Sequence, residues 1–483
     1  MGEPTYGEAS GATAVLAAFA AGTGTAATSH ADEVSRALAD TVAVAVAAAT
    51  SEGDAILRSW AGRENAHGQA TAWTSGETTS ASMAALLNGT AGHLLDYDDI
   101  SPSMPMHPST VLFPALLAVA EQRGIDGGRL VQAYDVGAAT FRALADLLPQ
   151  HVHYARGWHT TSTVGRLATV AALVRLCGTP AATAEHALGL VSSLVAGSRP
   201  NFGSMTKPLH AGVAARDAVM ALELAEAGFT ANTAELEAPG GFLERFGDPE
   251  LAPIGDAAET LAERLEYWQD AWVRDWGLKR YPACYGTHRG IDAVLELRAQ
   301  VGDRPIRSIT ATLHPNGTRP LGAYPPRNAT QAKFSLEYAL AAAIIRGNVL
   351  LSDFTEEAFA DERVRSLMER VSVGESAEPP LGDPGYGAGF TVVEIAFEDG
   401  GMLARRVDIT RGDALNPLDD DQLHTKFTDC CAIGGLTPEA TGELYSVLRA
   451  LPHGGRVSAA GAALAPGAWT PQMKAPQKKE AMA

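Results

Sequence analysis

Cysteine is scarce in this sequence, with four among 483 residues. They are Cys177, Cys284, Cys430 and Cys431, and the adjacent Cys430 and Cys431 are poorly placed to bridge each other. No CxxC spacing occurs, which argues against a disulfide scaffold and against a zinc-ribbon type of metal site. We therefore expect a reduced protein of the cytoplasm, in which Cys430 and Cys431 serve as small buried apolar residues.

Basic residues are also few. The chain has 37 lysines and arginines against 56 aspartates and glutamates, a net charge of -19. A protein that binds nucleic acid or an anionic membrane usually carries a basic field, so we expect neither partner. If the ligand is an anion, its positive side chains must be gathered locally.

Long apolar runs are missing. The Ala/Val-rich segment 41–50 has only ten residues, too short to cross a bilayer, and we expect it to form a buried helix. The N-terminus shows no basic segment followed by a long apolar run, so no signal peptide is expected.

The pattern that is present predicts a mainly α protein: a large all-helical domain with a smaller α/β insert. Residues 1–272 are rich in alanine and leucine, with apolar positions recurring every three or four residues. Residues 273–414 mix strands and helices, and 415–467 return to the helical domain. The Pro/Lys/Gln-rich residues 468–483 are expected to form a flexible tail.

The insert contains the strand signals. Residues 307–314 alternate apolar and polar, and 390–409 read as two strands joined at Asp399-Gly400-Gly401. A helix is expected between them, around 334–345. Asn416-Pro417 is expected to start the first returning helix.

Three predicted helices begin beside a basic or titratable side chain. His107 precedes Pro108 and an apolar helix, and His159 precedes a threonine-rich helix start. Lys207 precedes Pro208, which we expect to begin a helix running to 227, with Lys207 at its N-cap. A cation at a helix N-terminus opposes the helix dipole unless an anion lies in front of it. If these side chains converge, they form a pocket for a carboxylate-rich ligand.

Each of these residues also has a purely structural interpretation. A histidine before a helix is often a cap or the partner of a buried carboxylate, and Lys207 alone could be a surface charge. The small residues of "HAGVAARDA" after Lys207 favour close helix packing over binding. The repetition at three helix starts is what favours a functional site.

A run of carboxylates, "DYDD", follows a helical Ala/Leu-rich segment and includes Asp96, Asp98 and Asp99. One carboxylate near a lysine and two histidines supplies an acid/base partner. Asp98 and Asp99 are expected to be solvated or to cap a helix. A metal site is the weaker interpretation, because no calcium loop, HExxH or CxxC pattern accompanies the run.

Six segments together resemble the MmgE/PrpD family, which includes 2-methylcitrate dehydratase and cis-aconitate decarboxylase. In chain order they are "NGTAGHLLDYDD", "MHPST", "GWHTTSTVG", "GSMTKPLHAGVAAR", "KRYPACYGTH" and "AKFSLEYALAAAI", and the resemblance spans about residues 8 to 450. It implies a helical domain with an α/β lid, a homodimer, no metal or organic cofactor, and an active site in the interdomain cleft.

The resemblance also implies site residues. The family's decarboxylase-type site corresponds to Asp96, His107, His159, Lys207 and Lys279. We expect His159 as the acid/base, with Lys207, Lys279 and His107 anchoring carboxylates and Asp96 orienting a histidine or moving a proton. His210 and Tyr281, which lie in the same motifs, are expected to contact the substrate.

The sequence differs from the decarboxylase pattern at three points. The decarboxylases resemble "KRFPAH" where this chain reads "KRYPAC", so Cys284 stands in place of a functional histidine. His288, four residues later, is a possible substitute for that histidine. Ile100 or Ser101 stands where a threonine follows the aspartates, and the spacing from Asp96 to His107 is one residue longer.

Several functions therefore stay open at this stage. The first is a cofactor-independent lyase acting on a small di- or tricarboxylate, either a dehydratase of the 2-methylcitrate type or a decarboxylase of the cis-aconitate type. The second is an isomerase or epimerase on a similar substrate. The third is a catalytically silent carboxylate-binding protein. All of them draw on the same acid/base and cationic residues.

Overall fold

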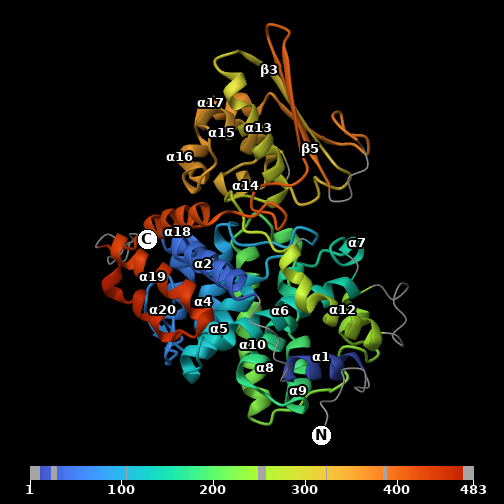
Figure 1. Ribbon diagram of the computed structural model, residues 1–483, viewed down its shortest axis with the longest axis vertical. Helices are drawn as coiled ribbons and strands as arrows, with labels where there is room; N and C mark the ends of the chain where they lie inside the picture. The colour runs from blue at the N-terminus through green and yellow to red at the C-terminus, as the bar shows by residue number, and fades with distance from the viewer. Residues whose placement is uncertain are drawn as a thin grey trace, which may run out of the picture.

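Two hydrophobic cores organise the chain (Figure 1). The computed structural model describes residues 11–22, 30–104, 106–148, 150–247, 257–322, 324–383 and 389–470. The larger core joins buried residues between Ala12 and Trp276 with others between Phe427 and Trp469, and the smaller one lies between Tyr281 and Val407. The molecule is thus mainly helical with a smaller α/β domain, as predicted.

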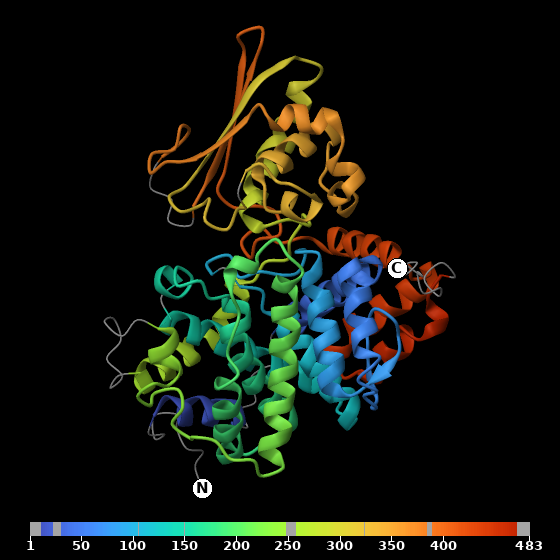
Figure 2. The same cartoon turned by 180° about the vertical axis from the view of Figure 1, so that it is seen from behind.

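The helical domain is formed by twelve described helices before the insert and three after it. They are α1 (Ala12–Ala21), α2 (Ala31–Ala47), α3 (Glu52–Ala61), α4 (Ala81–Leu94), α5 (Ser109–Arg123), α6 (Gly128–Leu147), α7 (Gln150–His153), α8 (Thr160–Cys177), α9 (Ala181–Ser192), α10 (Thr206–Glu226), α11 (Phe242–Phe246), α12 (Ala257–Ala271), α18 (Asp420–Gly434), α19 (Pro438–Ala450) and α20 (Ser458–Ala463). A short antiparallel pair, β1 (Ala70–Thr71) and β2 (Thr78–Thr79), was not expected from the sequence. The returning helix α18 packs along α2, and both views show this contact (Figures 1 and 2).

The α/β domain contains a four-stranded sheet with helices on one face (Figures 1 and 2). Its elements are α13 (His288–Val301), β3 (Ile306–Leu313), α14 (Ala329–Ala332), α15 (Leu336–Arg346), α16 (Glu356–Phe359), α17 (Glu362–Met368), β4 (Val371–Glu375), β5 (Thr391–Phe397) and β6 (Met402–Val407). The strand order is β4-β3-β5-β6, in which β3 and β4 are parallel and the other pairs antiparallel. The expected hairpin at Asp399-Gly400-Gly401 is present, with Gly400 at a φ of 87° that favours glycine.

Helices α4 and α10 pack backbone to backbone, and this contact positions the site. A Cβ on Gly212 of α10 would lie 2.2 Å from the carbonyl oxygen of Leu86, and one on Gly89 of α4 would lie 2.9 Å from Gly212 Cα. Only glycine permits such an approach, which confirms that the small residues after Lys207 serve close helix packing. The end of α4 and the start of α10 are thereby brought together.

Three local predictions need correction. Helix α10 begins at Thr206, so Lys207 lies inside its first turn and not at the N-cap. Helix α18 begins after Asp419, whose capping box with Gln422 replaces Asn416-Pro417 as the start signal. Trp469, placed in the expected tail, is buried against the helical core and bridges to Leu436, while residues 471–483 of that tail lie outside the described residues.

Within the described residues, no single helix is both long and apolar enough to cross a bilayer. One pair bent by 89°, Ala31–Thr50 with Glu52–Ala61, meets the length and composition criteria when taken together. The apolar segment 41–50 lies in the first of these helices and, except for Thr50, is buried in the core, as expected.

Candidate active site

The turn that follows α4 is the centre of the candidate site. Asp96 adopts a φ of 53°, a left-handed conformation that is uncommon for a residue with a side chain. Its carboxylate forms ion pairs with two lysines: Lys207 at Oδ1, and Lys279 at Oδ2 with a distance of 3.2 Å. Two expected site lysines from distant parts of the chain therefore meet at the expected aspartate.

Both lysines are buried with Asp96. Burial alone would raise the pKa of Asp96, but the ammonium groups of Lys207 and Lys279 outweigh burial and hold it well below its usual value. The Lys207 ammonium also lies 5.2 Å from the ring centre of Phe202 and 5.1 Å from that of Phe334, a cation–π arrangement on two sides. The carboxylate is thus ionised and held between two cations.

The backbone of the same turn accepts hydrogen bonds from lysines. Lys279 Nζ donates to the Asp96 carbonyl oxygen at 2.8 Å. Lys333 Nζ, from the α/β domain, donates to the carbonyl oxygen of Leu95 at 2.7 Å. Lys426 Nζ, on α18, donates to the Tyr97 carbonyl oxygen at 2.9 Å. Neither Lys333 nor Lys426 was singled out from the sequence.

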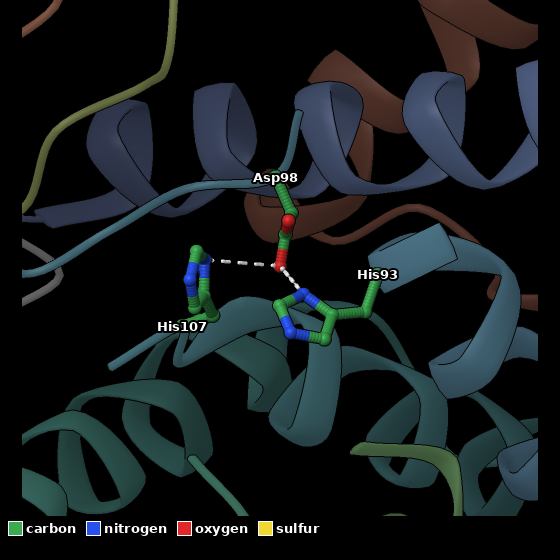
Figure 3. Close-up of side chains that lie close together, drawn as sticks. All are labelled: His93, Asp98 and His107. Atoms are coloured by element: carbon green, nitrogen blue, oxygen red, sulfur yellow. Dashed lines mark hydrogen bonds and ion pairs between the residues drawn. The ribbon is translucent and has the colours of Figure 1, made fainter. Parts of the chain in front are cut away.

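Asp98 orients two histidines (Figure 3). His93 Nδ1 lies 2.7 Å and His107 Nδ1 3.3 Å from the same oxygen, Asp98 Oδ2, and His107 Nδ1 also lies 2.9 Å from the Asp99 carbonyl oxygen. Because carboxylates and carbonyls only accept, each Nδ1 carries the proton and each neutral ring has its lone pair on Nε2. The carboxylate that orients histidines is thus Asp98, whereas Asp96, expected in this role, pairs with lysines.

These three side chains are also metal-ligand types, and their ligand atoms lie within 4.8 Å of one another. A ring nitrogen that donates a hydrogen bond has no lone pair for a metal. Metal binding there would therefore require both imidazoles to exchange tautomers and to give up their bonds to Asp98 and Asp99. The donor set fits a hydrogen-bonded carboxylate–histidine pair better than a metal centre.

The buried imidazoles are neutral at neutral pH. Burial lowers the pKa of His93 to about 3 and also lowers that of His107, in both cases against the opposing effect of Asp98. For Asp98, burial acts to raise the pKa, but the two imidazoles outweigh it and hold the pKa well below the usual value. Asp98 is therefore a charged acceptor between two neutral rings.

His159 occupies the N-cap position of α8 without a capping hydrogen bond from its side chain, and it joins this cluster. Its ring stacks on that of His93 at 5.8 Å, and its Nδ1 lies 3.2 Å from Nδ1 of His210. Burial lowers the pKa of His159 well below 6.5 and that of His210 to about 4, so both rings are neutral. The structure thus brings together His107, His159 and His210 near the two lysines.

Asp98 and Asp99 are both fully buried, so the expectation of solvated side chains is wrong. Asp99 does cap a helix, since its Oδ1 accepts from the backbone N–H of Ser109, the first residue of α5, at 3.1 Å. Burial raises the pKa of Asp99 to about 8. Asp99 thereby fixes the segment that carries His107.

Three further candidates lie on the α/β side. Cys284 is buried, with Sγ 3.6 Å from the Pro320 carbonyl oxygen, and burial followed by the charge of Asp96 raises its thiol pKa. His288 packs between Tyr281 and Tyr285, and burial with the nearby Lys279 charge lowers its pKa to about 3.

Tyr281 does not join the cluster. Its hydroxyl donates to Asp292 Oδ1 at 2.6 Å, and its ring belongs to the hydrophobic core of the α/β domain. His288 Nε2 is hydrogen-bonded to the carbonyl oxygen of Ala283 at 3.2 Å, which turns that nitrogen to the backbone. A role in contacting the substrate therefore has less support for Tyr281 and His288 than for the lysines.

Comparison with known proteins identifies the family. The MmgE/PrpD N-terminal domain matches residues 14–253, and the MmgE/PrpD C-terminal domain matches residues 281–443. The chain belongs to the MmgE/PrpD family.

Its relatives include decarboxylases. A cis-aconitate decarboxylase of Homo sapiens is 27% identical over 71% of each chain. A cis-aconitate decarboxylase-like protein of Aspergillus oryzae is 28% identical over 71% of this chain and 74% of its own length. A cis-aconitate decarboxylase of Aspergillus terreus is 25% identical over 74% of this chain and 75% of its own length. Family and relatives together place this chain among the lyases.

Proposed function

We propose that this protein is a cofactor-independent lyase that acts on a small di- or tricarboxylate by acid/base catalysis between its two domains. One observation carries the proposal: two buried lysines, Lys207 and Lys279, share the single carboxylate of Asp96 beside neutral imidazoles. The surplus positive charge suits an anionic substrate, and the neutral rings suit proton transfer.

Substrate carboxylates would bind at the two ammonium groups. A buried cation without its own counterion is costly, and an incoming carboxylate offsets that cost. The attraction is stronger in a buried site than in water because the surroundings screen it less. Negative charge that develops on the substrate during reaction is stabilised by the same groups.

Proton transfer would involve His107, His159 and Cys284. His107 holds its Nδ1 proton on Asp98 and Asp99, which leaves Nε2 as the base. His159 is neutral in the unliganded site and is likewise suited to accept a proton. Cys284 keeps its thiol proton because burial raises its pKa, so it is a proton donor.

Decarboxylation is the reaction we place first, because the relatives are named as decarboxylases. The bond between the substrate carbon and one carboxylate breaks, carbon dioxide leaves, and the electron pair is delocalised onto the remaining carbon framework. A remaining carboxylate held by Lys207 or Lys279 stabilises that charge. A proton from the Cys284 thiol then adds to the carbon.

Dehydration is the second candidate, favoured by the neutral His107 and by Cys284 at the position where the decarboxylase pattern has histidine. His107 Nε2 would remove a proton from the carbon next to a carboxylate. The hydroxyl on the adjacent carbon would then leave as water with a proton from the Cys284 thiol.

Proton NMR in heavy water distinguishes these reactions. The protein is incubated with cis-aconitate, citrate and 2-methylcitrate beside Lys207→Met and the matched surface variant Arg363→Met. Loss of carbon dioxide with uptake of one deuterium identifies a decarboxylase, and loss of water identifies a dehydratase. Deuterium exchange alone would identify an isomerase or epimerase. No reaction with any carboxylate of an extended panel would overturn the proposal.

The proposal includes assembly as a homodimer, which the family resemblance implies. Sedimentation equilibrium tests it, since a species of twice the chain mass is expected. A monomer at all concentrations used for the activity measurement would contradict it.

A further inference from the structure

All lysines before residue 474 lie around one turn. The chain has seven lysines: Lys207, Lys279, Lys333, Lys426, Lys474, Lys478 and Lys479. The last three fall outside the described residues. The first four contact Leu95, Asp96 or Tyr97, and every other basic residue of 1–473 except histidine is an arginine.

These four lysines differ in how their charge is balanced. Lys426 has its own counterion, Asp40, at 2.6 Å. Lys207 and Lys279 share Asp96. Within the described residues, Lys333 forms no ion pair with a carboxylate, although its side chain is buried and donates to Leu95 O.

Lys333 is a cation that the folded protein holds at a cost. Burial lowers its pKa to about 8; the charge of Asp96 opposes this lowering, and the charges of Lys279 and Lys207 add to it. An ammonium group has three N–H donors, and the Leu95 carbonyl uses one of them. An anionic ligand would supply both the missing charge and further acceptors.

Its position in the fold ties Lys333 to both domains. It directly follows α14, which lies at the edge of the α/β domain that faces the helical domain (Figure 1), and it reaches Leu95 at the end of α4. Its carbonyl oxygen accepts from the backbone N–H of Cys284 at 2.8 Å. This hydrogen bond fixes Lys333 relative to Cys284, the residue that replaces the histidine of the decarboxylase pattern.

We propose that Lys333 binds a substrate carboxylate other than those held by Lys207 and Lys279, and thereby makes the site prefer a tricarboxylate over a dicarboxylate. This inference rests on the proposed function. The ion pairs support it: Lys207 and Lys279 both pair with Asp96, whereas Lys333 pairs with no carboxylate of the described residues, so its charge is available to a ligand. Lys426 and Asp40 balance each other and are not part of this surplus.

Calorimetric titration with two matched ligands tests this. Propane-1,2,3-tricarboxylate and glutarate share a carbon chain with two terminal carboxylates and differ in the central one. We expect the native protein to bind the tricarboxylate about 10- to 100-fold more tightly, which corresponds to one charged hydrogen-bonded contact. In Lys333→Met this preference is lost while the dissociation constant for glutarate changes less than about threefold, and Lys333→Arg restores part of it.

Glutarate binding and thermal unfolding serve as folding controls. Without ligand, Lys333→Met should melt at the same or a higher temperature, because it removes an unpaired buried cation. Lys426→Met should melt lower, because it leaves Asp40 buried without its partner.

The results separate the two proposals. An unchanged tricarboxylate preference in Lys333→Met overturns the role of Lys333 alone, and so does an equal loss of both ligands. If the native protein binds neither ligand and turns over no carboxylate, the proposed function fails and this inference falls with it. Lys207→Met should weaken the binding of both ligands, because Lys207 is expected to bind a carboxylate that both of them carry.

Discussion

Lys207 and Asp96 form a buried ion pair although 111 residues separate them in the chain. The contact exists because α4 and α10 pack backbone to backbone through Gly89 and Gly212. Lys279 approaches the same carboxylate from the junction with the α/β domain. The pair therefore joins the packing of the helical domain to the chemistry that we propose.

Replacing Lys207 tests the role of the pair in binding. In Lys207→Met, Asp96 keeps Lys279 but the surplus charge at the carboxylate is lost, so kcat/KM should fall at least about 100-fold. Lys207→Arg should retain part of the activity. Steady-state kinetics measures the change, with Arg363→Met as the control because that side chain is exposed and remote. Equal activity in Lys207→Met and the control would remove Lys207 from the site.

Replacing Asp98 tests the orientation of the histidines. Asp98→Asn keeps the size of the side chain but removes the charged acceptor shared by His93 and His107, and its amide can donate to a ring nitrogen and favour the other tautomer. We expect kcat to fall about 10²- to 10⁴-fold, the usual contribution of acid/base catalysis. KM should change little, because the lysines that bind carboxylates are intact. An Asp98→Asn enzyme with native kcat would show that neither histidine acts as a base.

The pH dependence of ligand binding reports on Lys333. The pKa of this lysine is lowered to about 8, and the charges around it are Lys279, Lys207, Asp96 and Asp98. Affinity for propane-1,2,3-tricarboxylate should therefore fall as the pH rises above about 8, because the ammonium group loses its proton.

The stability of the unliganded protein should change in the opposite direction. A lysine with a lowered folded pKa binds fewer protons in the folded than in the unfolded state between about pH 8 and its unfolded pKa near 10.4. Its contribution to the free energy of unfolding thus rises with pH in this window. Lys333→Met should lack both effects, and a variant with native pH profiles would contradict this assignment.

The contact between α4 and α10 can be tested by adding one methyl group. In Gly212→Ala the new Cβ would meet the Leu86 carbonyl oxygen, so we expect a loss of about 1–3 kcal/mol in the free energy of unfolding and reduced activity. Gly442→Ala is the matched control, since nothing lies within 4 Å of a Cβ at that position in α19. It should stabilise the protein by about 0.5–1 kcal/mol. Urea unfolding of both variants measures the difference, and equal effects would show that the close packing is not required.

Much of the fold could be predicted because local signals agreed with tertiary packing. The helix that begins after His159 and the hairpin at Asp399-Gly400-Gly401 each depend on neighbouring residues alone. The strand β4 was missed because it is short and mostly exposed, and its partner β3 lies 58 or more residues earlier. The start of α18 was predicted too early because Asn416-Pro417 has the residue types of a helix start, whereas the capping box of Asp419 and Gln422 begins the helix.

The structure brings several of the predicted site residues together, while their roles in binding and catalysis stay predictions. Lys207 and Lys279 meet at Asp96, but the carboxylate that orients histidines is Asp98, which was expected to be solvated or to cap a helix, since spacing does not reveal which carboxylate faces which partner. Lys333 and Lys426 were missed, although lysine is so rare before residue 474 that its few positions are themselves a signal.

Release of carbon dioxide through the lysine–aspartate site can be followed with cis-aconitate labelled with carbon-13 at its carboxyl groups. Carbon-13 NMR follows the release of labelled bicarbonate by the native protein and by Lys207→Met under the same conditions. We expect release by the native protein and its loss in the variant, which would establish a decarboxylase that depends on the lysine–aspartate cluster. Release that is equal in both proteins would contradict the site, and no turnover of this or any other di- or tricarboxylate would contradict the proposed function.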